Sequence, residues 1–230
     1  MTSLFQSKRP VTIVGGGDVG PEDLNYALSI APTCVAADGG SIVALAAGIE
    51  LEAVIGDFDS LDASVLAQVP VERQHHISEQ NSTDFDKCLR NVDTPVVVGV
   101  GFLGGRVDPQ MAAMHALVVR ADRPCVLLGP HEVVFHCPAQ MELPTCGGDI
   151  VSLFPMSEVA GTSTGLEWPI DGLALAPGQR VGTSNCATGA IALTMTGPGM
   201  LCILPRRMLK DVTQLLASLP DHVKWPARAG

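Results

Sequence analysis

The segment CVAADGGSIVALAAGIELEAVIGDFDS, residues 34–60, places a helical pattern between two short apolar runs. The runs Cys34–Ala37 and Ala53–Ile55 are apolar at every position, without the alternation of a half-exposed strand. Such runs are typical of parallel strands that are covered on both faces. Residues 40–47 predict the helix that connects them, so this segment predicts a strand, a helix and a second, parallel strand.

The same alternation extends over the first 138 residues. Further apolar runs are Val11–Val14, Pro95–Val100 and Cys125–Leu128, and further helical patterns cover 21–30, 62–68, 82–91 and 107–120. We therefore expect an α/β domain over residues 1–138, with an open, mostly parallel sheet and helices on both of its faces.

After Pro138 the pattern changes. Glycine and proline recur every few residues, and strand-like runs such as 149–154 and 190–195 lie between them. A long helical pattern returns only at 206–218. Short strands at this spacing predict an all-β sandwich, so we expect a second domain over residues 139–230.

Composition excludes several classes of protein. The chain has 24 acidic and 14 basic residues and no basic stripe, which argues against a nucleic-acid partner. No apolar run approaches the roughly 18–20 residues that cross a bilayer, and the polar start Met1–Pro10 lacks the features of a secretory signal. The seven cysteines contain no C-x-x-C pair. We expect a soluble, cytoplasmic protein with reduced cysteines and no membrane partner.

Aspartates gather where predicted strands end and helices begin. They are Asp38, Asp57, Asp59, Asp84 and Asp108. Because ligands of an open α/β sheet bind at the carboxyl ends of its strands, we expect these side chains at one edge. Their mutual repulsion is relieved by a hard divalent cation such as Mg²⁺, which binds carboxylates together with substrate phosphates.

A basic and glycine-rich segment follows the run at 95–100. Gly104 and Gly105 allow the backbone to approach a phosphate chain, and Arg106 can fork onto its oxygens. A phosphoryl-transfer site combines a metal cation, an arginine, a backbone loop that surrounds the phosphates and carboxylates that position them. A single aspartate after a strand is more often a turn or cap residue, so the prediction depends on several signals at one edge.

These motifs, in their order and spacing, resemble those of the thiamine pyrophosphokinase family. They are Ala37-Asp-Gly-Gly40, Ile55-Gly-Asp-Phe-Asp-Ser60, Gln80-x-x-Thr-Asp-Phe85, Gly104-Gly-Arg-Val-Asp108, Thr164-Gly-Leu-Glu-Trp168 and Thr183-Ser-Asn185. The resemblance covers about residues 11–205. It implies a catalytic α/β domain followed by a β-sandwich, in a homodimer with active sites between subunits.

The resemblance also implies the reaction and the roles of residues. Pyrophosphate would pass from ATP to the hydroxyl of thiamine, giving thiamine diphosphate and AMP. The implied catalytic residues are Asp57, Asp59, Asp84, Arg106 and Asp108, of which Asp57, Asp59 and Asp84 would bind Mg²⁺. Trp168 would lie against the thiamine rings, a favourable cation–π contact. The implied binding residues for ATP and thiamine are Asp38, Gly39, Gly56, Ser60, Gln80, Thr83, Gly104, Gly105, Trp168, Ser184 and Asn185.

Other functions remain open. Residues 15–20 match G-x-G-x-x-G after a strand, and Asp38 follows about 20 residues on, as in dinucleotide-binding oxidoreductases. Asp18, Glu22 and Asp23 argue against a bare pyrophosphate at that helix start. A pyrophosphokinase for a pterin-type alcohol would keep the chemistry and change the acceptor. A sensor would bind the same ligands without releasing AMP.

Overall fold

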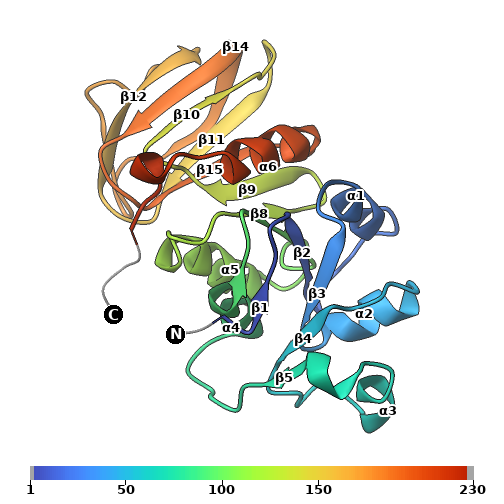
Figure 1. The fold of residues 1–230 in the computed structure, drawn as a ribbon. Helices are drawn as coiled ribbons and strands as arrows, with labels where there is room; N and C mark the ends of the chain where they lie inside the picture. The colour runs from blue at the N-terminus through green and yellow to red at the C-terminus, as the bar shows by residue number, and fades with distance from the viewer. Residues whose placement is uncertain (1–2, 227–230) are drawn as a thin grey trace. The chain divides into compact units, whose positions relative to one another are not determined.

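The computed structural model describes residues 3–226 (Figure 1). Of these residues, those up to 116 together with 127–130 form one compact unit. Those at 117–126 and from 131 onward form a second. No helix in this part of the chain is long and apolar enough to cross a membrane.

The first unit is built on a parallel sheet with the strand order β7-β2-β3-β4-β5. Its strands are β2 (Val11–Val14), β3 (Thr33–Ala37), β4 (Ala53–Gly56), β5 (Gln74–His76) and β7 (Val97–Val100). Every residue of β2, β4 and β7 is buried, which explains why Thr12 is the only polar side chain among them. A separate parallel pair joins β1 (Phe5–Gln6) to β6 (Val92–Asp93).

Helices connect these strands at the places that the sequence predicts. They are α1 (Asp23–Ile30), α2 (Gly40–Ala46), α3 (Ala63–Leu66), α4 (Asp84–Asn91) and α5 (Val107–Val119), with a 3-10 turn at Val71–Arg73. Figure 1 shows α1 and α2 on one side of the sheet and α4 on the other. Both faces are therefore covered, as the apolar strands require.

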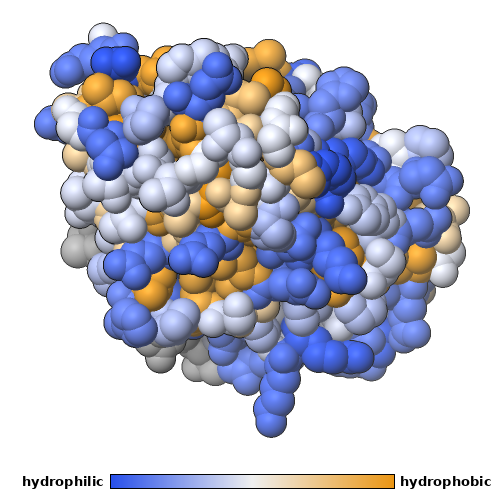
Figure 2. Space-filling model, turned by 90° about the horizontal axis from the view of Figure 1, so that it is seen from above, coloured by the Kyte–Doolittle hydropathy of each residue, from blue (hydrophilic) through white to orange (hydrophobic). Residues whose placement is uncertain are grey.

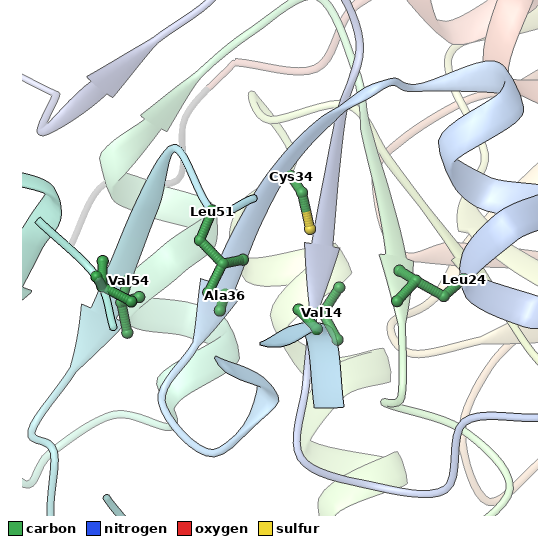
Figure 3. Packing of buried hydrophobic residues seen from close by; sticks show 8 residues of the cluster. Val14, Leu24, Cys34, Ala36, Leu51 and Val54 are labelled. Carbon is green, nitrogen blue, oxygen red and sulfur yellow. The ribbon is translucent and has the colours of Figure 1, made fainter. Parts of the chain in front are cut away.

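One buried cluster shows how the sheet and its helices hold each other (Figure 3). Val14, Cys34, Ala36 and Val54 come from three adjacent strands, and Leu24 of α1 packs with them. Burying a side chain such as leucine contributes about 2 kcal/mol. This core fixes the ends of β3 and β4, where two of the predicted site segments begin.

The second unit contains antiparallel strands, in the order β9-β15-β11-β14-β12-β13, with β10 paired to β14. They are β9 (Glu132–His136), β10 (Gln140–Leu143), β11 (Ile150–Pro155), β12 (Val159–Leu166), β13 (Ala174–Leu175), β14 (Gly182–Met195) and β15 (Met200–Pro205). The helix expected at 206–218 is present as a 3-10 turn (Arg206–Met208) followed by α6 (Leu209–Ala217). A last 3-10 turn spans Asp221–Val223.

The predicted mostly parallel sheet followed by a separate sandwich is confirmed only in outline. The chain has a large mixed sheet with helices, parallel in the first unit and antiparallel in the second. Strand β14 pairs with β11 through its first half, with β10 through its second half, and with β12 from Ala187 to Met195, so these strands form one connected network. Strand β8 (Cys125–Leu128) is divided between the two units. The two-layer sandwich is therefore not confirmed.

The surface is mainly hydrophilic on the face that Figure 2 shows. On the face shown in Figure 2, hydrophilic residues predominate and hydrophobic residues occur in smaller groups between them.

Five of the seven cysteines are buried, and burial raises the pKa of the Cys34 thiol to about 12. Buried thiols of this kind behave as small hydrophobic residues.

Candidate active site

Three of the predicted aspartates meet at the carboxyl ends of β3 and β4. One carboxylate oxygen from each of Asp38, Asp57 and Asp59 lies within 4.8 Å of the others. Asp38 is buried, with 2% of its surface exposed, whereas Asp59 is exposed. Three negative charges this close repel one another in the absence of a counter-charge.

The backbone around these aspartates is held in an unusual conformation. Asp38 and Phe58 have φ values of +42° and +62°, in the left-handed region that non-glycine residues rarely adopt. The backbone N–H of Phe58 donates to Asp38 Oδ1 at 2.8 Å, which ties the loop after β4 to the loop after β3. A Cβ on Gly56 would lie 2.7 Å from Asp38 Cβ, so only glycine fits there.

A buried lysine, which the sequence analysis missed, connects this group to Asp84. Lys87 Nζ donates to Asp57 Oδ2 at 2.6 Å and to Asp84 Oδ1 at 3.0 Å. Gln80 Nε2 donates to the same oxygen of Asp57 at 3.1 Å. Lys87 lies one helical turn after Asp84, a spacing that brings side chains together on α4 and could have revealed the pair.

The first turn of α4 holds these groups in position. Asp84 opens the helix, where a negative charge is favourable. Thr83 caps it by accepting a hydrogen bond from the backbone N–H of Asp86 at 3.2 Å. Thr83 therefore has a structural role in addition to any contact with a ligand.

Burial and the lysine shift the pKa values of the site. The hydrogen bond from Lys87 lowers the pKa of Asp57. Burial raises the pKa of Asp84, and Lys87 offsets this only in part. Burial opposes the charge of Lys87 itself, but the hydrogen bonds to the two aspartates outweigh it and raise the lysine pKa. Lys87 therefore stays charged at neutral pH.

The free oxygens of the aspartate group fit a hard cation. Within the described chain, Asp38 Oδ2 and Asp59 Oδ2 accept no hydrogen bond, and Asp57 Oδ1 has only a long contact of 3.4 Å from the Asp59 N–H. A set of carboxylate oxygens of this kind suits Mg²⁺. Of the three predicted metal ligands, Asp57 and Asp59 belong to the group, while Asp84 faces Lys87 and Asp38 takes the third place.

Arg106 and Asp108 pair with each other. Arg106 Nε and Nη2 donate to the two carboxylate oxygens of Asp108 at 3.1 and 2.7 Å. Both side chains are exposed, 81% and 67%, so the guanidinium is accessible. The carboxylate occupies the fork that a phosphate group would use. Asp108 does not join the aspartate group at the ends of β3 and β4.

A cleft of about 610 Å³ lies in the first unit beside these residues. The predicted site residues that line it are Asp38, Gly39, Ser60, Thr83, Asp84, Gly105 and Arg106. Gly15–Gly17, Phe102, Pro109 and Gln110 also line it and were not predicted as part of this site. The Gly17 N–H donates to Gly101 O at 3.1 Å, so the loops after the adjacent strands β2 and β7 meet at the cleft.

The same glycine loop bears on the dinucleotide alternative. The Gly20 N–H, just before α1, donates to the carboxylate of Asp23 at 2.8 Å. A dinucleotide pyrophosphate would require N–H groups at this helix start, where an acidic side chain is already bound. The geometry argues against that function.

The predicted residues of the second unit form a small group of their own. Asn185 is buried and brackets Trp168: its amide donates to Trp168 O at 2.7 Å and its oxygen accepts from Trp168 N at 3.2 Å. Trp168 itself is 58% exposed, so it is not an ordinary core residue. Ser184, at φ +60°, donates its N–H to Ser152 Oγ at 2.9 Å.

Comparison with known families accounts for both units. The model of the thiamin pyrophosphokinase catalytic domain matches residues 24–127. The model of the thiamin pyrophosphokinase vitamin B1 binding domain matches residues 132–198. This chain belongs to the thiamin pyrophosphokinase family.

Individual members of the family are distant relatives. Thiamine pyrophosphokinase 2 of Oryza sativa subsp. japonica is 30% identical over an alignment of 159 residues, and the match covers 58% of this chain and 57% of that protein. Thiamin pyrophosphokinase 1 of Caenorhabditis elegans is 27% identical over an alignment of 155 residues, and the match covers 59% of this chain and 62% of that protein. The chain thus spans about three fifths of the length of these curated relatives.

Solved structures of the family have a similar fold. The thiamin pyrophosphokinase of Geobacillus thermodenitrificans has a TM-score of 0.69 and 25% identity, over 85% of this chain and 96% of that one. The enzyme of Candida albicans has a TM-score of 0.70 over 87% of this chain and 93% of that one, and at 14% identity it shows the fold alone.

The two thiamin pyrophosphokinase models divide the candidate residues between them. Asp38 through Asp108, together with Lys87, lie in the part matched by the catalytic domain. Trp168, Ser184 and Asn185 lie in the part matched by the vitamin B1 binding domain.

Proposed function

We propose that this chain transfers a pyrophosphoryl group from ATP to the hydroxyl of thiamine, giving thiamine diphosphate and AMP. The observation that supports this most is the group formed by Asp38, Asp57 and Asp59 beside the cleft. It lies within the part matched by the catalytic-domain model of the family. Residues 1–138 would then bind the nucleotide, and residues 139–230 would bind thiamine.

Asp57 and Asp59, with Asp38, would hold Mg²⁺ through their free oxygens. Asp84, predicted as a ligand, would contribute through the oxygen that Lys87 does not occupy. When bound, Mg²⁺ would neutralise negative charge on the phosphates during transfer. The glycine loops at 15–17 and 104–105, which have no side chains, would let the same phosphates approach the backbone closely.

The protein side of the reaction is mainly positioning. Holding the thiamine hydroxyl in line with the β-phosphorus removes the entropic cost of bringing them together. Arg106 would exchange the carboxylate of Asp108 for phosphate oxygens and stabilise charge on the transferring group. The proton of the hydroxyl would pass to Asp59, or to Asp84 when its free oxygen does not bind the cation; burial raises the pKa of Asp84, which suits it to accept a proton.

Trp168 would provide the thiamine contact of the second unit. A flat cationic thiazolium on an exposed indole face is a favourable cation–π contact. Asn185 would act through Trp168, because its two hydrogen bonds are to the Trp168 backbone.

The homodimer and the cytoplasmic location stay predictions, to be tested by light scattering and by cell fractionation.

The test is product analysis of the full chain with ATP and Mg²⁺. Thiamine diphosphate should appear on chromatography when thiamine is the acceptor. A pterin-type alcohol should give no pyrophosphorylated product. The reverse pattern would replace thiamine by the pterin acceptor, and tight thiamine binding without any product would indicate a sensor.

A further inference from the structure

The buried ammonium of Lys87 has no place in the phosphate and thiamine contacts described so far. Its side chain is 1% exposed, although it comes from the middle of α4. Burying a lysine this completely is costly unless its charge is paired. Both of its ion pairs are to aspartates of the candidate site, Asp57 and Asp84.

The charges around Lys87 do not balance. Asp38, Asp57, Asp59 and Asp84 bring four negative charges to neighbouring positions. Among residues 3–226, Lys87 is the only basic side chain that pairs with any of them. Arg106 pairs with Asp108, and Arg90 pairs with Glu79 and Asp86. One resident cation therefore serves four carboxylates and leaves a net negative charge.

The lysine also distinguishes the two oxygens of Asp57. Oδ2 accepts from Lys87 and Gln80, at 2.6 and 3.1 Å, while Oδ1 has only the long contact from the Asp59 N–H. The side chain of Asp57 is thus held by Oδ2, while Oδ1 lies near the Asp59 N–H. Asp84 is held in the same way through Oδ1.

We propose that Lys87 is a built-in counter-cation, a positioning residue that keeps Asp57 and Asp84 in place when no divalent cation is bound. It occupies Oδ2 of Asp57 and leaves Oδ1 for that cation. The inference rests on the divalent-cation part of the proposed function. It follows that the divalent cation can replace part of what Lys87 contributes to stability.

The experiment compares the unfolding temperature of wild type and Lys87→Met, each in EDTA and in saturating MgCl₂. In EDTA, removing one partner of a buried pair should lower the unfolding temperature by about 10 °C. Mg²⁺ should raise the unfolding temperature of Lys87→Met more than that of wild type. The matched control is Lys210→Met, an exposed lysine of α6, which should behave as wild type in both buffers.

The affinity for Mg²⁺ is a second measurement, which a purely structural role of Lys87 would leave unchanged. A ligand stabilises the folded state in proportion to the logarithm of its affinity, so the larger gain requires tighter binding. Removing a positive charge beside the aspartates should tighten Mg²⁺ binding roughly tenfold by calorimetric titration. An equal Mg²⁺ gain in both proteins, zero included, overturns the proposal, and so does weaker Mg²⁺ binding by Lys87→Met.

A second variant covers the case in which Lys87→Met does not fold in EDTA. Lys87→Met with Asp84→Asn removes a charge of each sign and should be more stable in EDTA than Lys87→Met alone. If the double variant is no more stable, the pairing is not the reason for the lysine and the proposal fails. No arm uses ATP or thiamine, so a chain that forms no AMP can still pass this test.

Discussion

The backbone N–H of Phe58 donates to Asp38 Oδ1 at 2.8 Å, and this one bond joins the loops that follow two adjacent strands. It brings a residue from the end of β3 next to Asp57 and Asp59, which follow β4. The bond also stabilises the left-handed backbone of Phe58, a conformation that costs about 1–3 kcal/mol elsewhere in proteins.

Replacing Asp38 tests this connection. Asp38→Ala leaves the Phe58 N–H without its partner, so we expect a loss of about 1–3 kcal/mol in the free energy of unfolding. Asp38→Asn keeps an oxygen acceptor and should retain most of the stability while weakening Mg²⁺ binding. Urea unfolding and calorimetric titration measure the two effects. Equal stability of Asp38→Ala and wild type would contradict the structural role.

A second prediction concerns Gly56, whose backbone lies against the side chain of Asp38. Its Cβ in Gly56→Ala would lie 2.7 Å from Asp38 Cβ, so Asp38 or the strand end must shift. We expect a loss of about 1–3 kcal/mol in unfolding free energy together with lower turnover. Gly189→Ala is the control, because a Cβ there has nothing within 4 Å. Similar stability losses in both variants would show that the close approach is not the cause.

Trp168 is predicted to act on thiamine and not on the fold. Because the indole is 58% exposed, Trp168→Ala should change the unfolding free energy by less than about 0.5 kcal/mol. Loss of a cation–π contact should raise the KM for thiamine roughly tenfold. Phe154→Ala, another exposed aromatic residue of the second unit, should leave this KM unchanged. An unchanged KM in Trp168→Ala would remove Trp168 from the thiamine site.

Glu79, which lies outside the group of Asp38, Asp57 and Asp59, is expected to make the stability of the fold depend on pH. Hydrogen bonds from Ser82 and Arg90 lower the pKa of Glu79 to about 2, from an ordinary value of 4.5. A lowered carboxyl pKa stabilises the fold above the unfolded-state value, and this contribution disappears as pH falls toward the folded-state value. The stability advantage of wild type over Glu79→Gln should therefore shrink between pH 4.5 and about pH 2. Unfolding temperatures across this range measure it, and a constant difference would be inconsistent with the shift.

The parallel strands were predictable almost residue by residue, for a physical reason. Every residue of β2 and β4 is buried, and Thr12 is their only polar side chain, so the largely apolar run itself marks each strand. Strand β5, Gln74–His76, is only partly buried and has no such signal, and it was missed. The pairing of β14 with three other strands, β10, β11 and β12, could not be predicted, because a local sequence pattern does not show which strands pair.

The part of the candidate site that was predictable is the part placed by the ends of parallel strands. Asp38, Asp57 and Asp59 were expected together because parallel strands end at one edge, and they are together. Asp108 was expected with them but pairs with Arg106 two residues away, a choice of rotamer that sequence does not specify. Lys87 was missed because a lysine on a helix is usually solvated, and only its packing shows that it is buried.

The most direct test of the central claim is AMP release from ATP and Mg²⁺, measured with and without thiamine, by wild type and by Asp57→Asn. We predict AMP from wild type only when thiamine is present, and at least a hundredfold less from Asp57→Asn, in keeping with the loss of a charge-stabilising group in the transition state. Absence of thiamine-dependent AMP from wild type, or full activity of Asp57→Asn, would contradict the account.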